Sequence, residues 1–270
     1  MTQQSKSHGR KSISANSQPR ALMTQSPQLA GVWIAQILTL FPEAFPGVLG
    51  ESLTGRALKD GKWALDTIDL RLFGEGKHRN VDDTPAGGGA GMVLKPNVAG
   101  AALDRALAQQ KTPLPMVCLS PRGMPFTQAK ARAWANAGGV TMLCGRFEGI
   151  DQRVIDHYQL EEISLGDFVL TGGEIAAQAM IDATVRLLPD ILGNEASIAE
   201  ESHMAGLLEH PHYTRPALWN GRSIPDVLQS GHHINIAKWR QEMSHQVTKE
   251  KRPDLWAAFQ NALGEKDPKG

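Results

Sequence analysis

The sequence has few cysteines, no long hydrophobic run and no net charge, and each absence excludes a class of protein. Two cysteines among 270 residues are too few for a disulfide-stapled secreted scaffold or a structural zinc site. No apolar run approaches the roughly 18–20 residues of a membrane span. Lys and Arg number 28, as do Asp and Glu, and 41% of the residues are hydrophobic. We therefore expect a soluble, cytoplasmic protein with a sizeable core.

Several common ligand-binding signatures are also missing. The chain contains no G-x-x-x-x-G-K-[ST] phosphate loop, no G-x-G-x-x-G between a strand and a helix, and no G-x-S-x-G elbow. His210 and His212 could ligate a metal, but a His-Pro-His pair in a basic tail more often lies at the surface or faces RNA. Cys118 and Cys144 both lie in apolar runs, which predicts buried core thiols.

The neutral total hides an uneven charge distribution. Residues 1–31 contain four basic residues and no acidic one, so this stretch is +4 and the remaining residues sum to −4. It also holds six serines and few apolar residues, which predicts a disordered N-terminal extension. An organelle transit peptide is the alternative, because such peptides are basic, rich in serine and poor in acids.

Beyond residue 31, apolar strand patterns alternate with helical ones. Expected strands or extended segments cover residues 32–41, 64–72, 114–119, 140–144 and 167–170. Expected helices cover residues 48–58, 98–110, 128–137, 151–158 and 174–188. This alternation predicts an α/β domain with a mainly parallel sheet. Ligands of such sheets bind where the strands end, here in the loops 120–123, 145–149 and 171–174.

The composition changes after residue 192. Residues 193–208 carry few large apolar side chains at first, which predicts a flexible interdomain linker. Residues 209–264 are expected to form a small all-helical domain, with helices at 224–228, 234–247 and 253–263 and a tail at 265–270. Residues 1–31 and 32–192 complete this division as the extension and the α/β domain.

Two of the strand-end loops combine glycines with acidic residues. They read GRFEGID at 145–151 and GDFVLTGGE at 166–174. Glycine lets the backbone approach a ligand closely, and Glu174 occupies the helix start where a phosphate would otherwise be favoured. These loops therefore suit an uncharged or cationic ligand, and S-adenosylmethionine, a sulfonium without phosphate, fits. Ordinary turns with N-terminal acids are the alternative. The long Gly-rich loop 74–92 also predicts a function.

Seven motifs then occur in one order along the chain. They are HRNVDDTPAGGGAGM (78–92), LSPRG (119–123), GRFEGIDQRV (145–154), SLGDFVLTGGE (164–174), LGNEAS (192–197), HPHYTRP (210–216) and LQSGHH (228–233). With them, residues 32–260 resemble the bacterial tRNA (guanine-N1)-methyltransferases, which methylate guanosine 37, just 3′ of the anticodon. The resemblance implies a SPOUT-type α/β domain with a mainly parallel sheet and a deep trefoil knot, plus a small C-terminal all-helical domain. It also implies S-adenosylmethionine as methyl donor, Mg²⁺, a tRNA substrate, and a homodimer whose active sites are shared between subunits.

The resemblance implies a set of site residues as well. The implied donor contacts are Leu119, Ser120, Pro121, Gly145, Phe147, Glu148, Leu165, Gly166, Phe168, Val169, Leu170, Gly172 and Gly173, and Glu148 is also the suspected metal ligand. The implied RNA contacts are His78, Arg79, Asp82, Gly91, His212, Tyr213, Arg215 and Arg240. Guanine N1 carries a proton that a base must remove, and Glu201 matches the base. Arg186 matches the arginine that stabilises charge at guanine O6.

The chain departs from the family pattern at the predicted base. It has Glu200-Glu201-Ser202 where the family has Glu-Asp-Ser, so Glu201 carries one extra methylene and Glu200 is the other candidate. A displacement of order 1 Å can cost about 100-fold in rate. Phe147 in place of tyrosine and Ala176 in place of proline remove no group that the chemistry needs. The alternatives are a non-catalytic tRNA-binding relative and a SPOUT methyltransferase for another RNA base.

Overall fold

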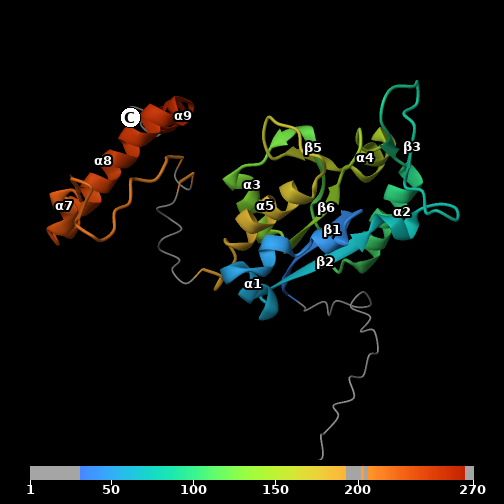
Figure 1. Cartoon of the computed structure of the whole chain (residues 1–270), viewed down its shortest axis with the longest axis horizontal. Helices are drawn as coiled ribbons and strands as arrows, with labels where there is room; N and C mark the ends of the chain where they lie inside the picture. The colour runs from blue at the N-terminus through green and yellow to red at the C-terminus, as the bar shows by residue number, and fades with distance from the viewer. Residues whose placement is uncertain (1–30, 193–201, 204–205, 265–270) are drawn as a thin grey trace, which may run out of the picture.

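The computed structural model describes residues 31–192, 202–203 and 206–264, and its first part is a parallel sheet between two layers of helices (Figure 1). The strands are β1 (Trp33–Thr39), β2 (Trp63–Asp69), β5 (Met116–Pro125), β6 (Gly139–Cys144) and β7 (Glu161–Ser164). They form one five-stranded sheet in the order β2-β1-β6-β5-β7, and every neighbouring pair is parallel. The expected α/β class is confirmed.

Helices cover both faces of this sheet, which explains why its central strands β1 and β6 are mostly apolar and almost wholly buried. Helices α1 (Ser52–Lys59), α3 (Gln128–Asn136) and α5 (Glu174–Val185) contribute to one apolar cluster, and α2 (Pro96–Gln109) and α4 (Gln152–Tyr158) to the other. Neighbouring residues of β1 point to opposite faces, because Ile37 belongs to the first cluster and Leu38 to the second, and both are fully buried.

One expected strand is wrong and its neighbour was missed. Residues 167–170 form bends, and the fifth strand is β7 at Glu161–Ser164. The sequence pattern did not indicate this strand because two of its residues are glutamates. In the fold each glutamate forms an ion pair, with Lys130 at 2.6 Å and with Arg122 at 2.7 Å, while Ile163 is buried. The expected loop 120–123 lies within β5, where the pairing with β7 shifts register between Leu119 and Met124.

Short 3₁₀ helices follow β1 and β2, and a pair of two-residue strands lies in the region of the long loop 74–92. β2 ends at Asp69, whose side chain accepts from the backbone N–H of Arg71 and begins a 3₁₀ helix, η3 (Leu70–Phe73). Two further 3₁₀ helices, η1 (Pro42–Ala44) and η2 (Gly47–Gly50), follow β1. The long loop contains the two-residue strands β3 (Asp82–Asp83) and β4 (Val93–Leu94), which pair antiparallel.

The C-terminal part is a separate group of helices (Figure 1). It contains α7 (Asp226–Gln229), α8 (His233–Lys251) and α9 (Pro253–Gly264). The rings of His245, Trp256 and Phe259 pack between α8 and α9 with centroids 5.4–5.7 Å apart. The expected helices are confirmed with shifted bounds. A hairpin of β8 (Leu218–Trp219) and β9 (Arg222–Ser223) was not predicted.

The predicted extension 1–31 lies outside the described residues except for residue 31, and the predicted linker 193–208 is described only at 202–203 and 206–208. Within the described part of the chain, no helix has both the length and the apolar composition that a membrane crossing requires.

Candidate functional site

A cavity of about 310 Å³ lies at the ends of β6 and β7, beside the register shift within β5. The loops that follow β6 and β7 line it, as expected for a parallel sheet, together with residues 118–122 of β5. Twelve of the thirteen predicted donor residues are among its lining: Leu119, Ser120, Pro121, Gly145, Phe147, Glu148, Leu165, Phe168, Val169, Leu170, Gly172 and Gly173. Gly166 is the exception; it lies behind the lining, and a Cβ there would approach the ring of Phe168 to 2.7 Å.

Two of the lining loops meet backbone to backbone. The N–H of Gly173 donates to the carbonyl of Gly145 at 3.0 Å, so the segment that enters α5 lies directly against the end of β6. A Cβ on Gly173 would lie 2.9 Å from the Cα of Cys144. A Cβ on Gly172 would collide with the guanidinium of Arg146. Both positions therefore exclude a side chain, which explains the Gly-Gly pair on steric grounds.

A buried ion pair between Glu174 and Arg146 holds the same two loops together. Glu174 is only 4% exposed, and its carboxylate accepts from Thr39 Oγ1 at 2.8 Å and from Arg146 Nη2 at 3.0 Å. The guanidinium of Arg146 also lies 4.4 Å above the centre of the Phe41 ring. Because Glu174 starts α5 and Arg146 follows β6, this pair joins the two halves of the cavity wall.

Sequence reasoning missed Arg146 as part of the site. The signal was present, since Arg146 stands between the predicted residues Gly145 and Phe147. Glu174 was interpreted only as an acid at a helix start, and its partners come from β1 and from the loop after β6. Such long-range pairings depend on the order of the strands, which the sequence pattern does not give.

The long Gly-rich loop 74–92 and the strand that follows it contact the cavity loop 145–149. The N–H of Glu148 donates to the carbonyl of Met92 at 2.9 Å, and that of Leu94 to Gly149 at 3.0 Å. Gly91 has a φ of +86°, and a Cβ there would collide with the Glu148 side chain. The structure thus brings together Gly91, a predicted RNA contact, and Glu148, a predicted donor and metal contact.

The other predicted residues of this loop lie near its beginning. His78 and Arg79 are exposed in a turn closed by two hydrogen bonds between Glu75 and Asn80, at 2.9 and 3.0 Å. Asp82 belongs to the short strand β3 and is half-buried.

Arg186, one of the two predicted catalytic residues, is not part of the cavity lining. Arg186 is the C-cap of α5. Glu174 starts the same helix and directly follows Gly173 of the cavity lining. Twelve helical residues at about 1.5 Å each separate them by roughly 18 Å. Glu201 and the other candidate base, Glu200, lie outside the described residues. The neighbouring Ser202 accepts a hydrogen bond from the N–H of Glu209 at 3.0 Å.

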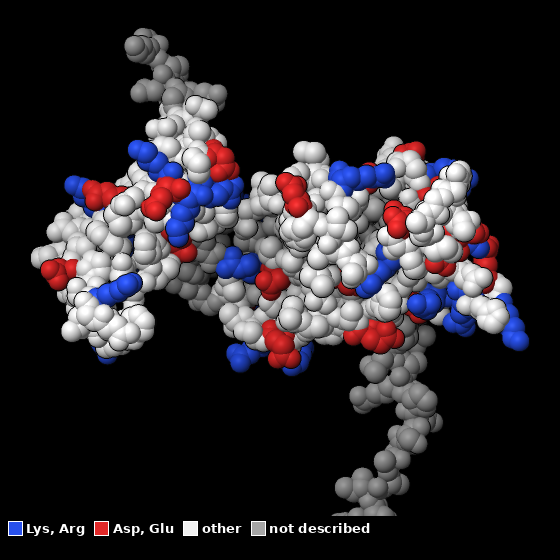
Figure 2. All heavy atoms as spheres, turned by 45° about the horizontal axis from the view of Figure 1, so that its top comes forward, with Lys and Arg blue, Asp and Glu red and all other residues white. Residues whose placement is uncertain are grey.

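The C-terminal RNA candidates lie close together in part. His212 forms an ion pair with Glu209 at 2.8 Å, and the Tyr213 ring packs 6.1 Å from that of Trp239 on α8. Arg215 and Arg240 are exposed. On the face drawn in Figure 2, basic and acidic side chains of the described residues are interspersed. This agrees with a local rather than a general basic surface.

Both cysteines are buried, as predicted. Burial, together with the nearby Glu162 carboxylate, raises the pKa of Cys118 to about 12. Complete burial also raises the pKa of Cys144 well above its usual value. Cys118 lines the cavity floor as a neutral thiol, so it is a packing group rather than a nucleophile.

Comparisons with known proteins identify the family to which this chain belongs. The family described as tRNA (Guanine-1)-methyltransferase TrmD matches residues 33–258. A tRNA (guanine-N(1)-)-methyltransferase of Ruegeria sp. (strain TM1040) is 64% identical over 238 residues, covering 88% of this chain and 98% of the relative. Proteins of the same name from Cereibacter sphaeroides (strain KD131 / KCTC 12085) and Brucella suis (strain ATCC 23445 / NCTC 10510) are 64% and 55% identical, covering 89% and 88% of this chain and 97% and 96% of their own lengths. The chain belongs to the tRNA (guanine-N1)-methyltransferase family of the SPOUT class.

Proposed function

We propose that this chain transfers a methyl group from S-adenosylmethionine to N1 of guanosine 37 in tRNA. The observation that carries the proposal is the single cavity that collects twelve of the thirteen residues predicted to hold the donor. Those residues come from three separate segments of the sequence, and family membership gives the reaction class. The deep trefoil knot belongs to the same proposal, and the hydrogen bond between Gly173 and Gly145 supports it because it brings the segment after β7 against the loop after β6.

The lining of the cavity suits the proposed donor chemically. Leucine, valine and phenylalanine side chains supply apolar walls, and Gly172 and Gly173 present backbone without a side chain. Glu148 offers a negative charge at the wall, which suits a cation. When bound there, S-adenosylmethionine supplies an electrophilic methyl group on a sulfonium. The protein's task is to hold that methyl about 3–3.5 Å from guanine N1 and in line with it.

The proton of guanine N1 must leave before N1 can attack. We assign its removal to the Glu201 carboxylate, which must come within hydrogen-bond reach of N1. We assign to Arg186 the stabilisation of the negative charge that then develops on O6.

We propose a homodimer because Arg186 lies far from the cavity of its own chain. Arg186 is roughly 18 Å from the helix start at its own cavity, too far for a guanine whose N1 faces the donor. We therefore propose that a second copy supplies the residues missing from each cavity. Exposed apolar side chains at the cavity rim support this, because Phe168, Val169 and Ile175 are 54%, 82% and 62% exposed.

Glu148 is the proposed Mg²⁺ contact. Mg²⁺ keeps several of its waters and typically takes one or two protein carboxylates, so a single exposed glutamate beside the cavity is a sufficient protein ligand. Among the described residues, Glu148 is not part of a group of three ligating side chains. The remaining ligands would be water and substrate.

We propose that the tRNA contacts two surfaces. His78, Arg79, Asp82 and Gly91 belong to the long loop next to Glu148, where the target base would enter. His212, Tyr213, Arg215 and Arg240 belong to residues 209–264, which we propose as a helical tRNA-binding domain after a linker at 193–208. Residues 32–192 are then the donor-binding domain. We propose a cytoplasmic location, because tRNA is the proposed substrate.

The first test is single-turnover methyl transfer to an unmodified tRNA transcript with guanosine 37. Wild type is compared with Glu201→Asp and Glu201→Gln. The proposal predicts transfer by wild type, retention in Glu201→Asp, and loss in Glu201→Gln.

Two other results would overturn parts of the proposal. An inert wild type that Glu201→Asp restores would favour a non-catalytic tRNA-binding relative. A Glu201→Gln variant as active as wild type would show that another group removes the proton.

A further inference from the structure

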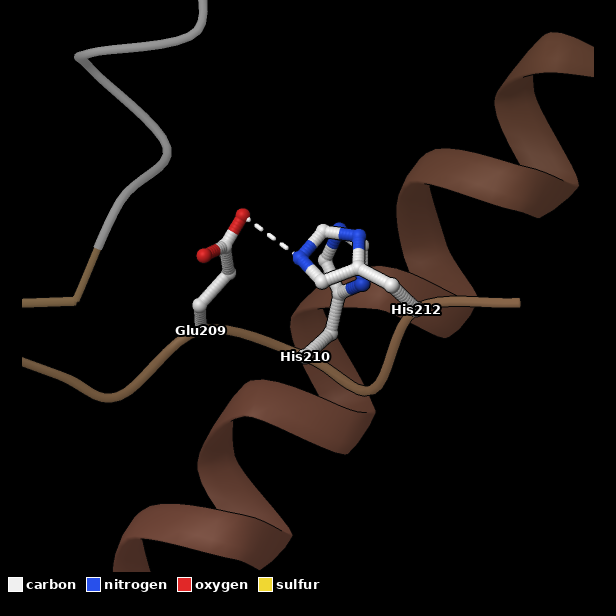
Figure 3. Close-up of side chains that lie close together, drawn as sticks. All are labelled: Glu209, His210 and His212. Carbon is white, nitrogen blue, oxygen red and sulfur yellow. Dashed lines mark ion pairs between the residues drawn. The ribbon is translucent and has the colours of Figure 1, made fainter. Parts of the chain in front are cut away.

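A second group of ligating side chains lies away from the donor cavity, in the segment that enters the C-terminal helices. Glu209, His210 and His212 each offer one ligand atom, and these atoms all lie within 4.8 Å of one another (Figure 3). The Glu209 carboxylate points at the imidazole of His212, with 2.8 Å between Oε1 and Nε2. The His210 and His212 rings lie side by side, with centroids 4.7 Å apart.

Helix α8 holds this segment in place. Thr248 Oγ1 accepts from the N–H of Leu208 at 2.8 Å, and Ser244 Oγ donates to the Leu208 carbonyl at 2.6 Å. Thr248 is fully buried. The His210 ring also packs 6.2 Å from the Trp239 ring. The residue before Glu209 is thus fixed at both backbone groups, and little ordering is required for the three side chains to meet one ion.

A hydrogen bond selects the ring nitrogen that His210 can offer. Its Nδ1 lies 3.2 Å from the carbonyl oxygen of Pro211. A carbonyl only accepts, so Nδ1 must carry the proton in this contact. The neutral ring then has its lone pair on Nε2. Orientation of a histidine by a backbone carbonyl in this way is the usual outer support of a metal-bound imidazole.

The donor set favours zinc over the hard cations. Two imidazoles and one carboxylate suit Zn²⁺, whereas Mg²⁺ and Ca²⁺ prefer oxygen ligands. Tetrahedral bonds of about 2.0–2.1 Å put neighbouring ligand atoms about 3.3 Å apart. The 2.8 Å contact needs a small opening, and the other ligand-atom separations, which lie within 4.8 Å, need to close by at most about 1.5 Å. The His212 side chain is 66% exposed, so an ion can enter and water can complete the coordination.

We propose that Glu209, His210 and His212 form a Zn²⁺ site with three protein ligands and a fourth position open to water. The site is separate from the proposed Mg²⁺ contact at Glu148 and does not depend on the proposed methyl transfer, and it shares His212 with the proposed tRNA contacts. An ion there would cross-link residues 209–212 beside α8.

The test is a zinc titration of the full-length chain, freed of any affinity tag, against a chromophoric zinc chelator. We expect one equivalent of Zn²⁺ bound. His210→Gln and His212→Gln should each lower the zinc affinity by at least about 10-fold, since even outer-shell changes cost about 10–100-fold. His233→Gln is the matched control, because His233 is an exposed histidine of α8 outside the cluster, and it should retain the wild-type affinity.

Two further readouts keep the result interpretable. Circular dichroism must show all variants folded, and Co²⁺ should give the visible absorption of a four-coordinate site in wild type and not in His212→Gln. Excess Mg²⁺ should not displace the zinc. The proposal is overturned if wild type binds no stoichiometric zinc, if either ligand variant binds as tightly as wild type, or if His233→Gln weakens binding equally.

Discussion

Replacing Arg146 by leucine tests the ion pair that joins the two halves of the donor cavity. The substitution removes the guanidinium from the carboxylate of Glu174, which is 4% exposed and keeps its hydrogen bond from Thr39. Breaking a buried pair by removing one partner costs about 3–5 kcal/mol. The Arg146 side chain is 28% exposed, and water on that side reduces the cost, so we expect about 2–3 kcal/mol.

Calorimetry of the unfolding transition measures this cost. For a domain of this size, each kcal/mol shifts Tm by about 2–4 °C, which predicts a Tm lower by about 4–12 °C. S-adenosylmethionine affinity, measured by isothermal titration, should fall as well, because the guanidinium of Arg146 fills the space beside Gly172. Arg153→Leu is the matched control: the Arg153 side chain is 78% exposed in its pair with Asp151, so Tm should change far less.

A double substitution separates charge burial from lost packing. Arg146→Leu with Glu174→Gln removes both charges, and replacing a whole buried pair is often close to neutral. The double variant should therefore recover most of the lost stability. Our reasoning is refuted if Arg146→Leu melts with wild type, or if the double variant is no more stable than the single one.

Three other predictions follow from single side chains. Gly172→Ala should weaken donor binding strongly, as measured by titration, because its Cβ meets Arg146 and Glu174 at once. Gly87→Ala is the control. A Cβ at Gly87 meets no atom within 4 Å, so the donor affinity should stay unchanged despite the strained φ of +91°. Cys118 has a pKa raised by burial to about 12, so at pH 8 roughly one thiol in ten thousand is ionised; disulfide-exchange labelling should be very slow until denaturant is added, and rapid native labelling would contradict the burial. Burial raises the pKa of Asp66, so its charged form destabilises the fold above that pKa. Asp66→Asn should therefore raise the stability to urea at pH 7, and this gain should shrink as the pH falls through the raised pKa. A gain that grows toward acid pH would contradict the assignment.

The sequence predicted the parts of the fold that depend on local pattern. The apolar run of β1 indicated a strand covered on both faces, and Ile37 and Leu38 indeed point into separate cores. The strand β7 was missed because Glu161 and Glu162 are polar, and only tertiary pairing with Lys130 and Arg122 makes that edge position stable. The β8–β9 hairpin did have a local signal: Asn220-Gly221, both with positive φ, is the preferred pair of a tight hairpin turn.

The candidate site divides in the same way. The sequence predicted that the glycines of the strand-end loops belong to the site. The structure gives a steric reason, because a Cβ on Gly172 or Gly173 would collide with neighbouring atoms. The pairing of Arg146 with Glu174 could not be predicted, since it joins residues 28 positions apart through the order of the strands. The distance between Arg186 and its own cavity likewise follows only from the length and direction of α5.

The central claim is that this chain methylates N1 of guanosine 37. The most direct measurement is transfer of labelled methyl from S-adenosylmethionine to two tRNA transcripts that differ only at position 37, guanosine or adenosine, followed by mass spectrometry of the nucleosides. We predict 1-methylguanosine from the first transcript and no transfer to the second. Equal labelling of both transcripts, or a methylated nucleoside other than 1-methylguanosine, would contradict the account.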